Sequence, residues 1–322
     1  MLKKSIFQKP ETSVFLCLMI LVVIMGVLKT EYFLTSNNIF NMLKSMSRVG
    51  IMSIGMTLVI ITAGIDLSVG SIMAVSSMTT ARLLMLGVHP LIAIPFGLIV
   101  GISLGMTNGL VITKLRVNPF IATLGMLSIG RGLAYFITIV GADSSGASVA
   151  SNISIDNSFI SFIGSGYIGD IPIQVIIMIA MVIISSLLLK YSVLGRQIYA
   201  VGSNEEAARL SGVEVNKVKI FVYAMCGFLC AIAGLIEAGM LSTAATNAGE
   251  GVELDVIAAV VIGGASLMGG RGSIIGAVIG AAIIAVIHNA FVQLQMPAYV
   301  QTITIGTVII LAVSIDRFKR KK

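Results

Sequence analysis

Long apolar runs, interrupted by very few charges, constrain this chain more than any other feature of its sequence. Only 11% of the 322 residues are charged, whereas a soluble globular protein carries roughly 25%. So few charged side chains cannot cover a surface that faces water. The sequence therefore excludes a soluble enzyme, a secreted disulfide-linked domain and a disordered chain. It predicts a membrane protein.

Ten apolar runs approach the roughly 20 residues that a helix needs to cross a bilayer. The runs are Val14–Leu28, Val49–Ala63, Val69–Gly87, Leu91–Thr113, Phe120–Val140, Ile173–Leu189, Val218–Ala238, Val256–Leu267, Ile274–Asn289 and Tyr299–Ile315. The run Val256–Leu267 is short enough for a broken or re-entrant helix. The first run follows three lysines, as a cleaved signal peptide would. No small-residue cleavage site follows it, so we expect a retained span.

The distribution of basic residues tests this count. With ten spans and a cytoplasmic N-terminus, sixteen of the 21 Lys and Arg residues lie on the cytoplasmic side. The outer loops receive only Lys29, Lys44 and Arg48, which is the asymmetry of the positive-inside rule. The net charge of +7 thus indicates topology and anionic lipid, not nucleic acid. We expect an all-α polytopic membrane helix bundle of about ten transmembrane helices, forming one domain over residues 1–322 with both termini cytoplasmic.

Glycines recur every four residues in two of the runs and predict close helix packing. The two strips are Gly97, Gly101, Gly105 and Gly109, and Gly272, Gly276 and Gly280. The segment Ile61–Ser71 shows weak sequence similarity to Val261–Arg271. Each segment ends a short apolar run at a polar, glycine-rich break. Interrupted helices at corresponding places in two halves point to a transport site.

The residues of an enzyme are missing from the sequence. The chain has two histidines, His89 and His288, and neither has a metal ligand at a suitable spacing. The segment Gly269–Ser273 lacks the lysine that a P-loop needs. We therefore expect no catalytic site, no metal, no cofactor in this chain and no ATP hydrolysis by it alone.

The polar side chains of the spans suit an uncharged, hydroxylated solute, although such groups also join helices by hydrogen bonds. The candidate substrate-pathway residues are Asn118, Phe120, Thr123, Arg131, Asn289 and Gln293. An ion-coupled secondary transporter is the alternative, but it usually needs ionisable groups within the membrane. Arg82, Arg131 and Glu237 are the few candidates within the runs.

A cytoplasmic loop at 190–217 contains a short predicted helix. Ser203 or Asn204 can cap it, Glu205 and Glu206 favour its first turn, and Gly212 suits the left-handed position that ends it. A helix of about two turns is not stable alone, so it must pack on its own bundle or on a partner.

Four ordered motifs make this chain resemble one family. Glu206–Gly212 matches the E-A-A-x-x-x-G pattern of ABC importer permeases. Gly64–Ser71, Asn118–Leu124 followed by Arg131-Gly132, and Glu253–Gly264 resemble stretches of their ribose/monosaccharide branch. The resemblance runs from about residue 30 to the C-terminus, and it is nearest in appearance to ribose permeases.

The resemblance implies a permease subunit that carries a monosaccharide, ribose foremost, across the bacterial cytoplasmic membrane. It implies a second permease copy, most simply a homodimer, a cytoplasmic ATPase that uses the ATP, and a sugar-binding protein outside. The external loop 141–172 is the expected contact for the binding protein. Permeases for another sugar or for the sugar-like autoinducer-2 are alternatives within the branch.

The resemblance also assigns residues. It places ATPase coupling on Glu205, Glu206, Ala207, Ala208 and Gly212, and the family signature at a helix break on Gly64, Asp66, Leu67, Ser68 and Gly70. For Asp66 two interpretations stay open: a helix cap at the break, or a pivot or gate.

Overall fold

The computed structural model describes residues 10–139 and 152–320, and almost all of its regular structure is helical. The helices are α1 (Pro10–Leu28), α2 (Ser36–Ile61), α3 (Val69–Met85), α4 (Pro90–Lys114), α5 (Pro119–Ile139), α6 (Ser158–Ser165), α7 (Ile173–Tyr191), α8 (Val193–Ser203), α9 (Glu205–Leu210), α10 (Val215–Leu241), α11 (Val252–Ile262), α12 (Ile274–Gln293) and α13 (Ala298–Arg320). The basic residues Lys3, Lys4, Lys9, Lys321 and Lys322 lie outside the described ranges, as does the part of the 141–172 loop that holds Asp143.

Four short strands complete the described part. β1 (Asn152–Ser154) pairs antiparallel with β4 (Thr243–Ala245), and Ile153 lies opposite Ala244. β2 (Tyr167–Ile168) pairs antiparallel with β3 (Ile171–Pro172).

Seven described helices are long and apolar enough to cross a membrane: α1, α2, α4, α5, α7, α10 and α12. α3 and the Ala298–Leu311 part of α13 are shorter apolar helices. The all-helical, multi-pass membrane fold expected from the sequence is therefore confirmed at this level.

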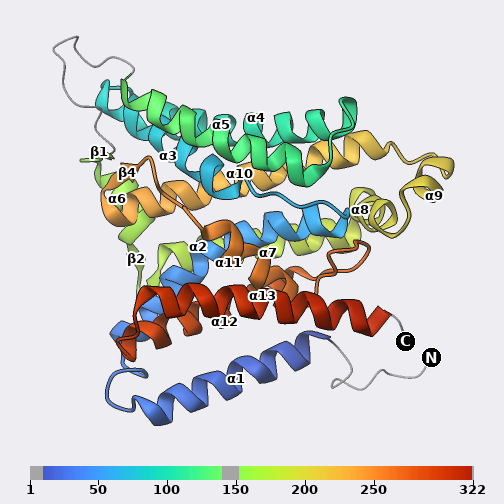
Figure 1. Ribbon diagram of the computed structural model, residues 1–322. Coiled ribbons are helices and arrows are strands. Elements are labelled where there is room, and N and C mark those ends of the chain that lie inside the picture. The colour runs from blue at the N-terminus through green and yellow to red at the C-terminus, as the bar shows by residue number, and fades with distance from the viewer. Residues whose placement is uncertain (1–9, 140–151, 321–322) are drawn as a thin grey trace.

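The long helices run roughly side by side, so the bundle has two ends (Figure 1). At one end lie α8, α9, the start of α1 and the end of α13; we name it the α9 end. At the other lie β1, β4 and α6; we name it the α6 end. The start of α1 and the end of α13 therefore lie at the same end of the bundle.

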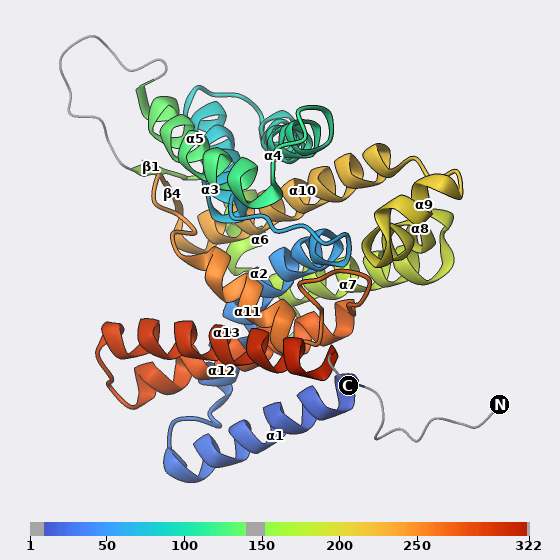
Figure 2. The same ribbon diagram turned by 45° about the vertical axis from the view of Figure 1, so that its right-hand side comes forward.

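The core is built around α2 and α10, which bury most of their length. Figure 2 shows α10 between α4 and the central helix α2. α4 meets α10 through the first glycine strip, since a Cβ on Gly101 would lie 2.7 Å from the Gly227 carbonyl oxygen. The second strip meets α11, because a Cβ on Gly280 would overlap the Ala259 carbonyl oxygen. The first predicted strip is confirmed. Of the second, Gly276 and Gly280 lie on α12 as predicted, whereas Gly272 precedes α12, and a Cβ on it would lie 2.7 Å from the Ile61 side chain.

The predicted helix breaks are also present. α2 ends at Ile61 and α3 begins at Val69, while α11 ends at Ile262 and α12 begins at Ile274. α11 is 11 residues long, in agreement with the expectation of a short helix over this run.

Three local expectations need correction. α2 begins at Ser36, well before the apolar run Val49–Ala63. Its first half is polar, and Thr35 is the N-cap residue that starts the helix there. α8 was not expected from the sequence. The described part of the 141–172 loop folds into β1, α6, β2 and β3, since Asn157 caps α6 and Gly164 of α6 packs backbone to backbone against Gly239 of α10.

Candidate functional site

The short helix α9 has the geometry that its sequence predicts. The Oδ1 atom of Asn204 accepts a hydrogen bond from the Ala207 N–H at 3.0 Å, so Asn204 is the cap. Gly212 has a φ of +83° and ends the turn in the left-handed conformation that glycine adopts readily. Ala208 is buried, whereas the side chain of Glu206 is 68% exposed. α9 thus anchors by one small residue and presents its charges to solvent.

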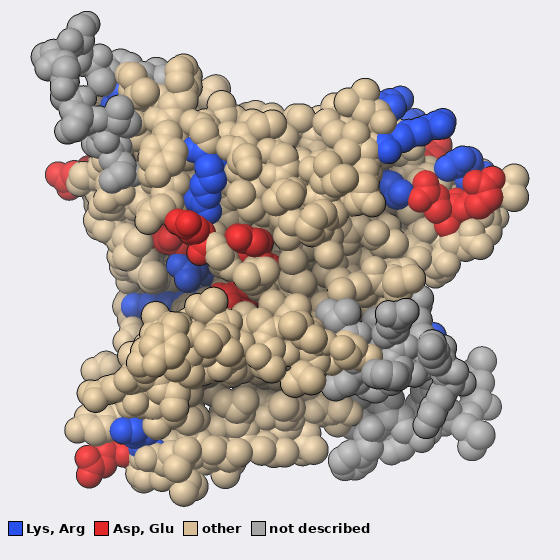
Figure 3. Space-filling view, in the orientation of Figure 1, with Lys and Arg blue, Asp and Glu red and all other residues tan. Residues whose placement is uncertain are grey.

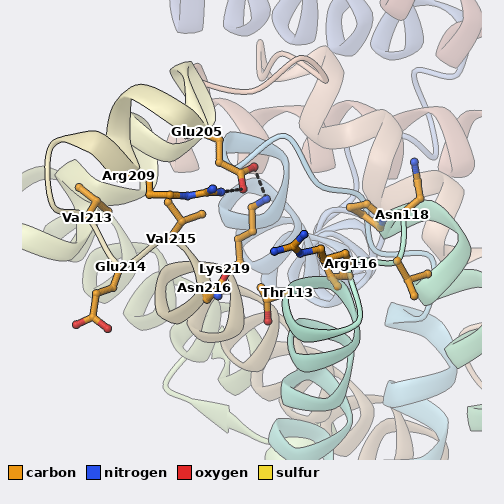
Figure 4. Close-up of a pocket in the computed structure, with 13 residues that line it drawn as sticks. Thr113, Arg116, Asn118, Glu205, Arg209, Val213, Glu214, Val215, Asn216 and Lys219 are labelled. Carbon is orange, nitrogen blue, oxygen red and sulfur yellow. Dashed lines mark hydrogen bonds and ion pairs between the residues drawn. The ribbon is translucent and has the colours of Figure 1, made fainter.

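Basic side chains surround Glu205 at a cavity of about 770 Å3 at the α9 end. Arg209 reaches one oxygen of Glu205 at 3.4 Å and Lys219 reaches the other at 2.6 Å. Figure 4 shows both contacts, with Arg116 extending toward them from the segment after α4. Three basic residues, Arg116, Arg209 and Lys219, line this cavity together with two carboxylates, Glu205 and Glu214. The excess of positive charge favours an anionic partner group.

The Lys219–Glu205 ion pair is the more protected of these contacts. The Lys219 side chain is only 17% exposed, so water screens this pair less than a surface pair. Lys219 belongs to α10 and Glu205 to α9, so the pair joins α9 directly to α10, one of the two helices around which the core is built.

The family-signature residues of the sequence analysis lie at the α2–α3 break. Asp66 is fully buried, and its Oδ1 accepts hydrogen bonds from the Ser68 N–H at 2.9 Å and the Ser68 hydroxyl at 2.5 Å. Asn108 of α4 donates to the same hydroxyl at 2.8 Å. The other oxygen of Asp66, Oδ2, accepts no hydrogen bond from the described residues. Asp66 therefore orders the break through Ser68, the N-cap residue of α3.

The remaining signature residues pack the same break. Leu67 contacts the core, and the Tyr223 hydroxyl of α10 donates to the Ile65 carbonyl at 3.2 Å. A Cβ on Gly64 would lie 2.5 Å from that Tyr223 oxygen, and one on Gly70 would overlap the Gly249 carbonyl oxygen. Both glycines are needed because neighbouring groups fill the space of a side chain.

A second cavity, of about 540 Å3, lies toward the α6 end, and we name it the α6-end cavity. It is lined by α2, α10, α11, α12, α13 and the segment after β4. Arg48 of α2 forms an ion pair with Glu237 of α10. His288 of α12 lies between two partners: Nε2 is 3.0 Å from Asp255 Oδ2, and Gln301 of α13 contacts Nδ1. Figure 3 shows charged side chains gathered in a hollow of this face.

The sequence analysis did not assign Arg48, Glu237, Asp255 or His288 to the substrate pathway. Arg48 and Glu237 are separated by 189 positions, and Asp255 and His288 by 33, so no local spacing links them. One signal was available: Glu237 lies within an apolar run, while Arg48 and Asp255 lie immediately before one. An ionisable residue within a membrane segment is by default a functional candidate.

Arg131 of α5 shapes the wall of this second cavity. Its Nη1 donates to the Thr246 carbonyl at 3.0 Å and to the Ala248 carbonyl at 2.6 Å. Ala248 lines the cavity, so Arg131 positions the cavity wall through its backbone.

The other substrate-pathway candidates lie elsewhere. Asn289 and Gln293 of α12 both donate to the Asn38 Oδ1 of α2, at 2.7 and 3.2 Å; they join two helices. Thr123 is buried and donates to the Pro119 carbonyl at 2.9 Å. Asn118 accepts from the Phe120 N–H at 2.9 Å and lines the α9-end cavity, and Phe120 is 51% exposed. The structure does not bring these five residues together.

The second cavity has the chemistry of a site for a hydroxylated solute. Small-ligand sites are concave, of roughly 300–1,000 Å3, with a few polar groups that fix orientation. Carboxylates accept hydrogen bonds from hydroxyls, whereas the arginine and amide groups donate. In the described ranges, no group of three or more His, Cys, Asp or Glu side chains could hold a metal ion.

Comparison with known proteins gives one consistent result. Residues 38–313 match the family described as branched-chain amino acid transport system / permease component. The chain is 41% identical over 310 residues to the ribose import permease protein RbsC of Escherichia coli (strain K12), covering 96% of this chain and 94% of that protein. No solved structure matches the chain.

Two further relatives extend the comparison. The ribose import permease protein RbsC of Bacillus subtilis (strain 168) is 44% identical over 305 residues, covering 95% of this chain and 92% of that protein. The D-allose transport system permease protein AlsC of Escherichia coli (strain K12) is 39% identical over 308 residues, covering 95% and 91%.

Proposed function

Since the chain belongs to the branched-chain amino acid transport system / permease component family, we propose that it is the membrane subunit of an ABC importer for a monosaccharide, with D-ribose the first candidate. The observation that carries this proposal is identity above 40% to two ribose import permeases over nearly the whole of both chains. Because those matches span the α9 segment and the α6-end cavity alike, both sites lie within the related region.

The proposal includes a topology. α3, α11 and α13 join the seven long apolar helices as spans, which gives ten, and the α9 end faces the cytoplasm of a bacterium. The distribution of basic residues supports this orientation. Lys114, Arg116, Lys190 and Arg196 belong to segments at the α9 end, whereas Lys29 and Lys44 belong to segments at the α6 end.

Partners follow from the same orientation. A cytoplasmic ATPase subunit docks on α9 and uses the ATP, and a second copy of this chain completes the pore. A sugar-binding protein delivers its ligand at the α6 end, where the described part of the 141–172 loop, from β1 to β3, lies. This chain itself performs no catalysis, in keeping with relatives that are named as permeases.

The mechanism separates energy input from solute contact. ATP binding draws the two ATPase subunits together, and α9 of each permease copy moves with its subunit. The two ends of the bundle then open in turn, because the ATP-bound ATPase has a higher affinity for one conformation of the permease than for the other. Sugar hydroxyls meet Glu237, Asp255, His288 and Gln301 as they pass the α6-end cavity.

Reconstitution tests this function. Proteoliposomes that contain the permease and its ATPase subunit, with the binding protein added outside, are supplied with labelled D-ribose, D-allose or D-fructose. We expect ATP-dependent uptake of D-ribose that persists when an ionophore collapses the ion gradients. Preferred uptake of D-allose or D-fructose would change the substrate, and uptake that needs an ion gradient but no ATPase subunit would overturn the proposal.

A further inference from the structure

The end of α8 lies at a junction of three segments that are distant in sequence. A Cβ on Gly202 would overlap the carbonyl oxygen of Ile61, the last residue of α2, and would lie 2.7 Å from the backbone nitrogen of Gly270. Gly270 belongs to the segment 263–273 between α11 and α12. α8 therefore touches both helix breaks at one point.

Hydrogen bonds hold the three segments together. The Gly270 N–H donates to the Ile61 carbonyl at 2.8 Å, so the two breaks are joined directly. The Tyr199 hydroxyl of α8 donates to the Gly272 carbonyl at 2.9 Å. Gly270 has a φ of +73°, which glycine adopts without strain. We name the contacts of Tyr199, Gly202, Ile61, Gly270 and Gly272 the glycine junction.

The connection between α9 and the glycine junction is short. Asn204 alone separates α8 from α9, and both helices use it: its N–H donates to the Ala200 carbonyl at 3.1 Å, and its side chain caps α9. Gly202 lies two positions before this link. A displacement of α9 thus reaches Gly202 through hydrogen-bonded backbone and not through a flexible loop.

Space and chemistry around Tyr199 allow such a displacement. A cavity of about 350 Å3 borders Tyr199, Gly272 and Ser273, so the segment before α12 has room to move. Burial raises the pKa of the Tyr199 hydroxyl, and the Glu11 carboxylate raises it further. The hydroxyl therefore stays protonated and donates throughout the physiological range.

The elements beyond the junction lead to the α6-end cavity. α12 begins just after Gly272 and carries His288, and α11 ends just before the segment 263–273 and carries Asp255. α2 ends at Ile61 and carries Arg48. Two of the helices that line the cavity, α2 and α12, therefore end or start at the glycine junction, and the segment 263–273 connects it to the end of α11.

We propose that Tyr199 and Gly202 are positioning residues that transmit the movement of α9 to the two helix breaks, and so couple ATP use to opening of the sugar path. This inference rests on the proposed function. Tyr199 pulls on the segment before α12 through its hydrogen bond, and Gly202 keeps α8 in contact with α2. Neither residue touches the sugar.

The test compares Tyr199→Phe and Gly202→Ala with matched controls in the same proteoliposomes. Tyr191→Phe removes the hydroxyl of an exposed tyrosine, and Gly306→Ala adds a methyl group where nothing lies within 4 Å. Three quantities are measured for each variant: ATPase subunit retained, ATP hydrolysed and D-ribose taken up. The ratio of sugar to ATP separates coupling from a merely structural role, because unfolding lowers uptake and hydrolysis together.

We expect both variants to retain the ATPase subunit and to hydrolyse ATP. Loss of one hydrogen bond predicts a fall of about fivefold in sugar per ATP for Tyr199→Phe, and the overlap at Gly202 predicts a larger fall. An unchanged ratio in Tyr199→Phe overturns the inference even if Gly202→Ala fails to fold. If the wild-type protein shows no ATP-dependent uptake of any of the three sugars, the proposed function itself fails, and the coupling role fails with it.

Discussion

The two polar cavities contain similar residues but differ in how water reaches them. At the α9 end the ion pairs of Arg209 have side chains 44–68% exposed, and such pairs contribute about 0–1 kcal/mol each. At the α6-end cavity the Glu237 side chain is 10% exposed and faces Arg48. The first set is free to exchange its partners for those of another protein, whereas the second fixes the positions of the helices around a cavity.

Removing Glu237 should have the largest effect on stability. Breaking a fully buried ion pair costs about 3–5 kcal/mol, and because the Arg48 side chain is 30% exposed we expect Glu237→Ala to lower the free energy of unfolding by about 2 kcal/mol. Thermal unfolding in detergent micelles measures it.

The double variant Arg48→Met with Glu237→Met is the control for this prediction. An apolar pair replaces the ion pair, so stability should recover while D-ribose uptake should not. Recovery of uptake in the double variant would show that the charges only hold the helices together.

Asp255→Asn should lower stability less than Glu237→Ala does, and its main effect should be on the KM for D-ribose uptake. The amide still accepts a hydrogen bond from His288, so the loss of stability should stay below about 1 kcal/mol. Loss of the carboxylate should raise the KM for D-ribose uptake about tenfold, since a hydrogen bond to a charged group contributes about 1.5–3 kcal/mol. Glu31→Gln, at an exposed position between α1 and α2, should leave KM unchanged; an equal shift in both would remove Asp255 from the sugar path.

Lys219→Met tests the link between α9 and α10. Its pair with Glu205 is partly protected, so we expect a stability loss of about 0.5 kcal/mol and a several-fold fall in uptake at a normal level of bound ATPase. Lys217→Met is the matched control, because Lys217 is 76% exposed and its pair with Glu214 lies three positions away, within one segment of the chain. Equal uptake by the two variants would contradict a mechanical role for Lys219.

Leu210→Ser should leave stability nearly unchanged, within about 0.5 kcal/mol. Leu210 is 82% exposed on α9, so its apolar surface is available to a partner. We expect the variant to retain about tenfold less ATPase subunit in a pull-down, as loss of an apolar anchor at an interface does. Leu241→Ser at the α6 end is the control, and normal retention by Leu210→Ser would argue against docking on this face.

Local sequence signals predicted the α9 region well. The cap Asn204, the acidic first turn and Gly212 lie within nine consecutive residues, and each acts on its own backbone neighbours. The strip on α4, and Gly276 and Gly280 on α12, were predicted for the same reason, because a period of four places the residues on one helix face. Gly272 has the same spacing but lies before α12, which begins at Ile274.

The α6-end cavity could not be predicted in this way. Its ion pair and its Asp255–His288–Gln301 chain join residues of different helices, and only the packing of α2, α10, α11, α12 and α13 brings them together. Asn289 and Gln293 were assigned to the substrate pathway because polar groups in apolar runs suit a sugar. In the structure both donate to Asn38 across a helix contact, and the sequence does not distinguish such a contact from a role in the substrate pathway.

The central claim is that the ATPase subunit binds at the α9 end and the sugar at the α6-end cavity. A pull-down combined with an uptake assay tests it most directly. Immobilised permease carrying Glu206→Lys or Asp255→Asn is incubated with the ATPase subunit, and the same variants are assayed for ATP-dependent D-ribose uptake. We predict that Glu206→Lys loses the ATPase subunit, that Asp255→Asn retains it, and that uptake falls in both. Full retention by Glu206→Lys, or loss of the subunit by Asp255→Asn, would contradict the assignment of energy input to the α9 end and sugar contact to the α6-end cavity.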